Sequence, residues 1–331
     1  MSTVQASQTS AAGRSDADPP WWRRSAADLA LPIMLVAVIV IGALTTSGFL
    51  TVDNARAVLI NASVVGIAAV GMTPVTLSGN FISLGVQQSA VLAAIVFLAL
   101  LGTGWPVLLA LLAAVAIVLI TGVLQGLVVA AGLNPVITTL AAGAVIFGIV
   151  TAVTKGQVIT APGVDLAWMG SKTLLGLPVA VYAFVLFTLF ITWVMTRTVI
   201  GRQMLLLGAN RATARLSGVR VRTATVAAFL SLSLGAALAG VITAAQLGQA
   251  TSSDLPDLTI NVIAAVLVGG TAIGGGEGSA LRSAIGAVII AMFNNLMLLH
   301  DLPIGGRLTL TGLLVAVVVT VLQLLRTRGT R

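Results

Sequence analysis

Neutral amide and hydroxyl side chains are the residues of this chain best suited to chemistry, because they fall inside or beside long apolar segments. Each can donate or accept hydrogen bonds, so together they suit an uncharged solute rich in hydroxyl groups, which needs a partner at every step of a passage. The same side chains would serve equally well as hydrogen bonds between packed helices. The candidate pathway residues are Asn80, Ser83, Gln87, Asn134, Thr138, Asn261 and Asn294.

Residue patterns for bond-breaking chemistry are missing. The sequence has no HExxH or GxSxG motif, no cysteine and a single histidine, His300, so metal-based and nucleophilic catalysis lack their parts. The glycine-rich stretch VGGTAIGGGEGSALRS (268–283) is similar to a phosphate-binding loop, but it has no GK[ST] ending, and its only charge before the next apolar segment is Glu277. We interpret it as a tight, flexible cytoplasmic turn, which leaves any ATP hydrolysis to another chain.

Composition places the candidate residues in membrane helices. Hydrophobic residues make up 58% of the 331 residues, and the mean hydropathy is +1.11. These values are typical of a multi-pass helical membrane protein, so we predict an all-α integral membrane protein with about ten transmembrane helices. The segment 258–273 is short for a full crossing and is a candidate half-helix or re-entrant piece. The expected segments are 29–46, 57–77, 81–101, 106–131, 134–154, 177–196, 223–245, 258–273, 281–299 and 308–325.

The basic residues predict which side of the membrane faces the cytoplasm. An even number of crossings puts both termini on one side, and thirteen of the seventeen Lys and Arg residues then fall on that side. Under the positive-inside rule this side is cytoplasmic, in a bacterial plasma (inner) membrane. The isoelectric point near 11.6 therefore reflects charges at the membrane edges, beside lipid, and does not indicate a nucleic-acid partner.

The two ends of the chain complete the expected domain organisation. Residues 1–24 are predicted to form a disordered cytoplasmic N-terminus that ends in an interfacial anchor of Trp21, Trp22, Arg23 and Arg24. This N-terminus lacks the basic-then-apolar order of a cleaved signal peptide. Residues 25–326 are expected to form the transmembrane domain, and residues 327–331 a cytoplasmic tail.

The stretch RTVIGRQMLLLGANRATARLSGVRVR (197–222) is the one large polar surface that the chain offers to a partner. It contains six arginines and no acid, although only 8% of the whole chain is charged. Helix-forming residues between Gly208 and Gly218 suit a rigid element that docks onto another protein. In the alternative, purely topological interpretation, the arginines only hold the loop in the cytoplasm, but fewer charges would be enough for that.

Four stretches of the sequence resemble the ribose/xylose-type sugar ABC transporter permeases, and the resemblance runs from about Gly48 to Leu325. It implies a fold similar to that of vitamin B12-type importers. It also implies a second permease copy, a pair of ATP-binding subunits that bind ATP and magnesium, and an extracytoplasmic solute-binding protein; no cofactor is implied in this chain. The stretches are GFLTVDNARAVLINASVVGIAAVGMTPVTLSG (48–79), NPVITTLAAG (134–143), LGANRATARLSGV (207–219) and IAAVLVGGTAIGGGEGS with the following helix, which ends in FNNLMLL (263–299).

In that family the position of GANRATARLSGV forms the coupling helix, which sits in a groove of the ATPase and is dragged when ATP binds. The ATPase-coupling residues that the resemblance implies are Gly208, Asn210, Arg211, Ala212, Arg215, Leu216 and Gly218. The chain departs from the family pattern where acids are common, at Phe81, Thr259 and Asn261, and it also has Arg211 in place of an acid and Glu277 in place of a base. The neutral replacements indicate a small polar solute more firmly than a particular hexose or pentose.

The expected function is therefore a transport subunit, not an enzyme, that moves a small polar solute, foremost a monosaccharide, into the cytoplasm by alternating access. An ion-coupled secondary carrier is the alternative, but none of the nine acids lies clearly at mid-span, where ion coupling would need one. A membrane-embedded transferase acting on lipid-linked sugars would need charges clustered near one interface. A homodimer and a heterodimer with a sister permease fit the sequence equally well.

Overall fold

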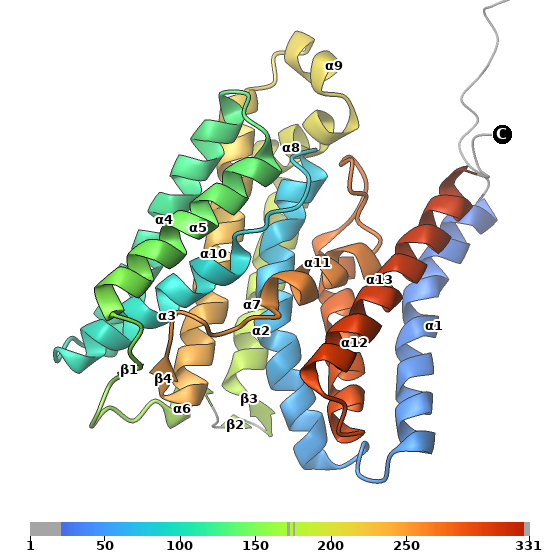
Figure 1. Cartoon of the computed structure of the whole chain (residues 1–331). Coiled ribbons are helices and arrows are strands. Elements are labelled where there is room, and N and C mark those ends of the chain that lie inside the picture. The colour runs from blue at the N-terminus through green and yellow to red at the C-terminus, as the bar shows by residue number, and fades with distance from the viewer. Residues whose placement is uncertain (1–20, 171–172, 175, 328–331) are drawn as a thin grey trace, which may run out of the picture.

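The computed structural model describes residues 21–170, 173–174 and 176–327, and the regular structure within them is almost entirely helical (Figure 1). The strands are pieces of two residues that form two antiparallel pairs. The all-α prediction is therefore confirmed. The expected N-terminal segment 1–20 and the end of the tail, 328–331, lie outside the described residues, as do the side chains of the expected anchor, 21–24.

The elements follow one another with short connections. The helices are α1 (Trp21–Thr45), α2 (Val52–Leu77), α3 (Val86–Gly102), α4 (Val107–Ala130), α5 (Pro135–Thr154), α6 (Ala167–Gly170), α7 (Val179–Arg197), α8 (Val199–Ala209), α9 (Arg211–Leu216), α10 (Val221–Leu247), α11 (Leu258–Val268), α12 (Ala280–Leu299) and α13 (Ile304–Thr327). Strand β1 (Ile159–Thr160) pairs with β4 (Gln249–Ala250), and β2 (Thr173–Leu174) pairs with β3 (Leu177–Pro178).

Within the described residues, six helices are both long and apolar enough to cross a membrane: α2, α4, α5, α7, α10 and α12. The remaining expected segments carry shorter apolar helices, namely α3, α11 and the apolar parts of α1 and α13. Helix α11 has 11 residues, so it rises about 16 Å, half of a hydrocarbon core of about 30 Å. It is too short to cross alone, as its sequence indicates.

Two of the expected segments include several residues that are not helical. The segment expected at 81–101 begins as a helix only at Val86, and residues 78–85 are irregular; we call residues 78–85 the break. Gly79 and Phe81 adopt φ values of 73° and 56°, which a right-handed helix excludes. The segment expected at 258–273 ends at Val268, because the glycine-rich loop 269–279 begins there with Gly270 at φ 76°.

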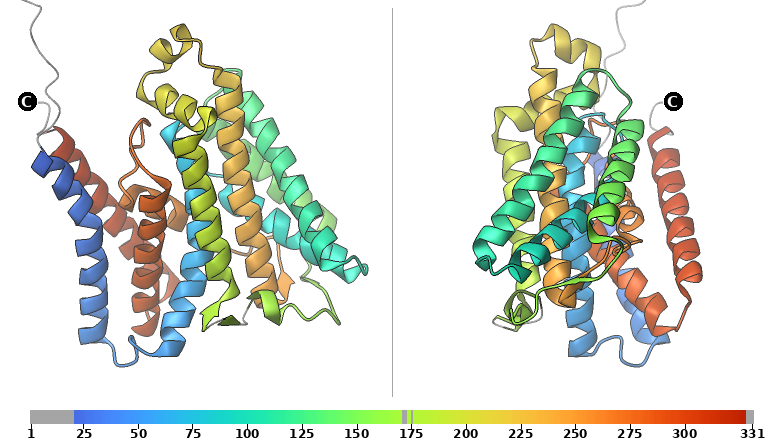
Figure 2. Two further views of the ribbon diagram at one scale, coloured as in Figure 1. Left: turned by 180° about the vertical axis from the view of Figure 1, so that it is seen from behind. Right: turned by 60° about the vertical axis from the view of Figure 1, so that its left-hand side comes forward.

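Helix α2 forms the centre of the molecule. Every residue from Ala62 to Leu77 is buried, so this helix has no face left for lipid over most of its length. Helices α7, α10, α11 and α12 pack around it (Figures 1 and 2). Helices α4, α5 and α7, in contrast, leave large apolar side chains such as Leu112, Ile149 and Leu186 exposed. An apolar surface on these outer helices is the surface expected to face lipid.

Glycines let α10 approach α2 closely. A Cβ atom at Gly71 would lie 2.7 Å from the Ser231 backbone oxygen, and one at Gly235 would lie 2.7 Å from the Ile67 backbone oxygen. The hydroxyl of Ser231 also donates to the Gly71 backbone oxygen at 3.0 Å. Small residues thus bring α10 and α2 together, in the manner usual for helices packed in a membrane.

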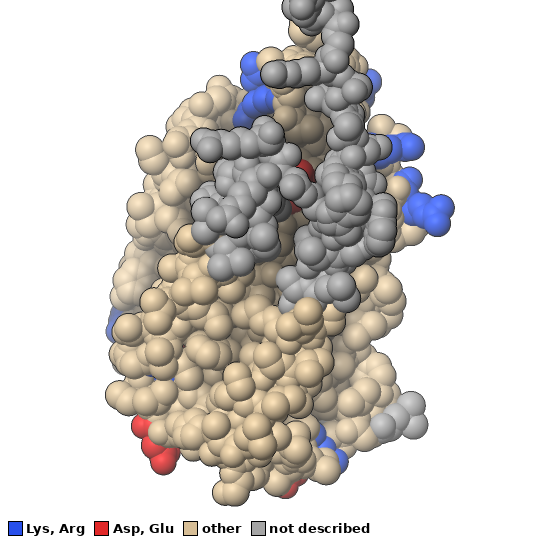
Figure 3. All heavy atoms as spheres, turned by 90° about the vertical axis from the view of Figure 1, so that its right-hand side faces the viewer, with Lys and Arg blue, Asp and Glu red and all other residues tan. Residues whose placement is uncertain are grey.

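One end of the molecule carries α9, the end of α8 and the glycine-rich loop, and the start of α1 and the end of α13 lie toward the same end (Figures 1 and 2). The space-filling view in Figure 3 shows several Lys and Arg groups around this end and mostly uncharged surface below them. The positions of the helix ends agree with an even number of passes through the bundle.

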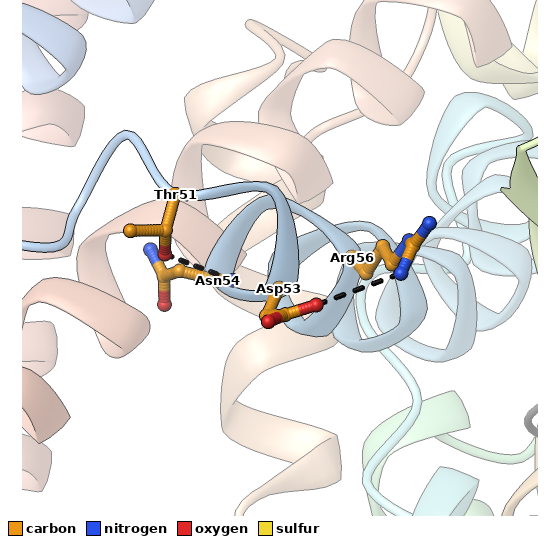
Figure 4. Close-up of polar contacts among 4 residues, drawn as sticks. All are labelled: Thr51, Asp53, Asn54 and Arg56. Carbon is orange, nitrogen blue, oxygen red and sulfur yellow. Dashed lines mark hydrogen bonds and ion pairs between the residues drawn. The ribbon is translucent and has the colours of Figure 1, made fainter.

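At the opposite end, the start of α2 is fixed by polar contacts (Figure 4). The Thr51 hydroxyl accepts a hydrogen bond from the Asn54 backbone amide at 3.4 Å, and Arg56 lies 3.5 Å from Asp53. The Asp53 side chain is 94% exposed, so this ion pair contributes little to stability. The amide of Asn295 donates to the Asn54 side-chain oxygen at 2.8 Å and thereby ties α12 to α2.

Candidate functional site

Asn210 lies between α8 and α9 in the arginine-rich segment 197–222. Its backbone amide donates to the Leu206 oxygen at 3.1 Å and so closes the end of α8. Its side-chain oxygen accepts from the backbone amides of Ala212 at 3.0 Å and Thr213 at 3.1 Å, which caps the start of α9. One residue therefore ends one helix and begins the next, and it fixes the direction in which α9 leaves α8.

Gly218 closes the other end of α9. Its φ is 76°, and its backbone amide donates to the Arg215 oxygen at 3.2 Å. The Val219 amide donates to the Ala214 oxygen at 3.1 Å. Together these two bonds form a Schellman motif, which uses glycine because a residue with a side chain is strained in the left-handed conformation. Helix α9 has only six residues, so the caps at its two ends satisfy a large share of its backbone groups.

The outer surface of α9 is suited to docking. Leu216 is 90% exposed, and Ala212 and Arg215 are exposed beside it, while Ala214 is buried against the body of the protein. Partial burial, and secondly the neighbouring Arg215, lower the pKa of Arg211 from its ordinary value. An exposed leucine among arginines on a rigid short helix is the pattern of an interface anchor with a basic rim.

The break carries Asn80 and Ser83, both of which are buried. The Asn80 side-chain nitrogen donates to the Ser78 hydroxyl at 2.9 Å, whereas its side-chain oxygen is buried and accepts no bond from the described residues. The hydroxyl of Thr139, in the first turns of α5, accepts from the Leu84 backbone amide at 3.1 Å. The break is therefore held by polar contacts and keeps one free acceptor inside the protein.

Phe81 is the strained residue of the break. Its φ of 56° lies in the left-handed region, and its side chain is 47% exposed. Replacing Phe81 with Asn, which tolerates this conformation, is expected to relieve about 1 kcal/mol of strain and to raise the melting temperature in detergent by about 2 °C. Leu133→Asn is the control, because Leu133 is an exposed loop residue outside the left-handed region. A melting temperature of Phe81→Asn no higher than that of the natural chain would contradict the prediction.

The N-termini of the two short helices α3 and α11 meet inside the bundle. The Gln87 backbone amide donates to the Thr259 hydroxyl at 3.2 Å, and the Gln87 side chain donates to the Asp254 backbone oxygen at 3.1 Å. Thr259 is thus a neutral acceptor for a helix N-terminus. Two converging N-termini create a region of positive potential that favours electron-rich groups.

A cavity of about 210 Å³ lies between α2, α11, α12 and α13. A chain of hydrogen bonds crosses its wall: Asn294 donates to the Asn261 side-chain oxygen at 3.0 Å, and Thr311 donates to the Asn294 side-chain oxygen at 3.2 Å. Apart from these three and three further polar residues, the cavity is lined by apolar side chains. The polar lining residues are Asn61, Asp257, Asn261, Asn294, Arg307 and Thr311.

The structure brings together only part of the pathway set expected from sequence. Asn261 and Asn294 line the cavity, and Asn80 and Ser83 lie in the break. Asn134 is the N-cap of α5, where it accepts from the Val136 amide at 2.9 Å, and the Thr138 hydroxyl donates back to the Asn134 backbone oxygen. Neither residue lines the cavity.

Four of the six polar lining residues are not in the pathway set expected from sequence: Asn61, Asp257, Arg307 and Thr311. Arg307 stands just before the expected segment 308–325, and Thr311 lies within this mostly apolar segment. The signal that could have found them is the run RLTLTG (307–312), in which polar residues alternate with leucine at the start of the last helix.

A family model described as "Branched-chain amino acid transport system / permease component" matches residues 54–324. The ribose import permease protein RbsC of Haemophilus influenzae is 32% identical over 292 residues, which cover 87% of this chain and 90% of that protein. The galactofuranose transporter permease protein YtfT of Escherichia coli K12 is 33% identical over 249 residues, 74% of this chain and 72% of that protein. The D-allose transport system permease protein AlsC of the same organism is 29% identical over 265 residues, with 80% and 81% covered. No solved structure matches the chain significantly.

Proposed function

Because the chain belongs to the sugar ABC transporter permeases, within the family of branched-chain amino acid-type permease components, we propose that it is the membrane subunit of an ATP-driven importer. Its solute is a small polar molecule, foremost a monosaccharide, which it passes into the cytoplasm by alternating access. The observation that carries the proposal is α9, a short helix capped at both ends that presents Leu216 and Arg215 to a partner.

The chain is a multi-pass inner-membrane protein. We further propose that it crosses the membrane about ten times in a vitamin B12-importer-like fold and has both termini in the cytoplasm. Two such permeases form the translocation unit, either as a homodimer or with a sister subunit. Two ATP-binding subunits dock at α9 and bind ATP and magnesium, and an extracytoplasmic solute-binding protein delivers the solute at the opposite end.

The cavity is proposed as a stopping point for the solute. Its volume of about 210 Å³ is below the range of roughly 300–1,000 Å³ that is typical of small-molecule pockets, so only a small solute fits. The amides of Asn261 and Asn294 and the hydroxyl of Thr311 offer both donors and acceptors. Asp257 and Arg307 contribute opposite charges to the lining, which supports a neutral solute over an anion or a cation.

The mechanism requires no covalent chemistry in this chain. When ATP closes the pair of ATP-binding subunits, α9 moves with the groove in which it is docked, and the two permeases swing from one access state to the other. From the cavity the solute passes Asn80 and Ser83 in the break, where the unpaired oxygen of Asn80 is an acceptor for a hydroxyl group. Each step exchanges one set of hydrogen bonds for another.

Affinity purification from native membranes in mild detergent tests the proposal. We expect a stoichiometric ATP-binding protein to be recovered with the natural chain, and its companion binding protein then identifies the solute by ligand screening. Recovery of the chain alone, with uptake that survives ATP depletion and collapses with the ion gradient, would replace the importer by an ion-coupled carrier.

A further inference from the structure

Three chain segments that are distant in sequence meet through backbone atoms just below α9. They are the end of α2 with the following turn, the last residues of α8, and the glycine-rich loop. The Gly276 backbone amide donates to the Leu77 backbone oxygen at 2.9 Å and so bonds the loop to α2 directly. We call this meeting point, which contains Gly79, Gly208, Gly275 and Gly276, the glycine junction.

The glycines of the junction have no space for side chains. A Cβ atom at Gly208 would overlap the Leu77 backbone oxygen and lie 2.5 Å from the Gly276 nitrogen. A Cβ atom at Gly275 would lie 2.7 Å from the Gly79 Cα and 3.0 Å from the Gly208 Cα. The obstructing atoms all belong to backbone, so no flexible side chain can move aside. Displacement of one segment must therefore displace the others.

The junction connects the docking element to the break. Gly208 lies two residues before Asn210, the cap of α9, and Gly79 lies immediately before Asn80. Only Ala209 and Asn210 separate Gly208 from α9. Gly79 is the residue directly before the buried Asn80, so its movement also moves the polar groups of the break. The path from one to the other is short and consists of backbone contacts.

We infer that the glycine junction transmits the movement of α9 to the break, and that Gly208 is a positioning residue whose missing side chain makes this transmission possible. The inference rests on the proposed function, because it needs a partner that moves α9. It predicts that the surroundings of the break change with the nucleotide state of that partner, and that this change depends on contact at Gly208.

The natural chain has no cysteine, so a single cysteine in place of Ile82 reports on the break without background. The complex with the ATP-binding subunits would be labelled with a fluorescent maleimide, first without nucleotide and then trapped with ATP and vanadate. We expect the labelling rates of Ile82→Cys in the two states to differ by about fivefold or more. Equal rates in the two states of an ATP-hydrolysing complex would overturn the inference without any change at Gly208.

Gly208→Ala then tests the contact itself in the Ile82→Cys background. Gly208 lies in a helix, so alanine adds no backbone strain there and acts only through the Cβ contact. We expect the labelling difference between the two nucleotide states to be lost in those Gly208→Ala complexes that retain the ATP-binding subunit. Gly274→Ala is the matched control, because a Cβ atom at Gly274 meets nothing within 4 Å.

The outcomes separate this inference from the proposed function. If Gly208→Ala keeps the full labelling difference, or if Gly274→Ala loses it as well, the junction does not transmit the movement. If the natural chain retains no ATP-binding subunit at all, the proposed function fails first, and the inference falls with it.

Discussion

Replacing Asn210 and Arg215 together with alanine is expected to abolish ATP-driven uptake while the protein still inserts into the membrane. Loss of the Asn210 cap, which holds two backbone amides, costs about 1 kcal/mol. Loss of an arginine that becomes a desolvated contact near the centre of an interface costs about 2 kcal/mol. Together, about 3 kcal/mol corresponds to a roughly hundredfold weaker affinity for the ATP-binding subunit.

Titration of the purified permease with its ATP-binding subunit measures this affinity, and solute-stimulated ATP hydrolysis measures the coupling. Asn134→Ala is the matched control, because Asn134 caps α5 with the same geometry, accepting from the backbone amides of Val136 and Ile137. It should lower thermal stability similarly and leave the affinity for the ATP-binding subunit unchanged. Natural affinity in the double variant would show that α9 is not the docking element.

Replacing Asn294 with leucine is expected to lower the rate of solute uptake strongly. Asn294 is the centre of the hydrogen-bond chain in the cavity wall, since it donates to Asn261 and accepts from Thr311. Leucine has nearly the same size but removes both interactions and leaves the other two groups without their partner. At about 1 kcal/mol for each hydrogen bond, loss of two predicts a roughly thirtyfold lower maximal rate of uptake.

The measurement for Asn294→Leu is solute uptake into proteoliposomes that contain the ATP-binding and solute-binding subunits, together with ATP hydrolysis. We expect hydrolysis to continue, so more ATP is consumed for each molecule transported. Asn295→Leu is the control: Asn295 is the next residue of α12, but it bonds to Asn54 and does not line the cavity. It should reduce thermal stability with little effect on uptake. Equal loss of uptake in both variants would make Asn294 a structural residue.

Helix positions could be predicted from sequence because apolar segments of membrane length leave few other structures. The short α11 could also be anticipated, since only 11 residues separate Asp257 from Gly269. The break could not be predicted, because Phe81, Ile82 and Leu84 continue the apolar pattern of the helix that follows. Its irregular backbone is set by Gly79 and by contacts with α5 and α8, which hydropathy does not record.

The candidate sites also include features that local sequence predicts and features that it cannot predict. The caps of α9 follow from local sequence, because Asn before a helix and Gly after it have defined roles. Asn134 followed by proline carries the same N-cap signal, and it caps α5 in the structure. The glycine junction depends on three distant segments, so local sequence predicts only a simple turn for the loop, whereas Gly276 is bonded to Leu77 in the structure.

The complete burial of α2 has a consequence for the order in which the protein is assembled. Helix α2 is synthesised early, whereas α10 and α12, which cover it, follow more than a hundred residues later, so during biogenesis it must stay in lipid with its future contact surfaces bare. Two of its buried hydroxyls have hydrogen-bond partners within α2 and therefore do not need the later helices: Ser63 donates to the Leu59 backbone oxygen at 2.7 Å, and Thr73 donates to the Ala69 oxygen at 2.8 Å. Because these polar groups are satisfied within the helix itself, α2 can enter the lipid before the other helices have been made. The remaining helices then pack around it.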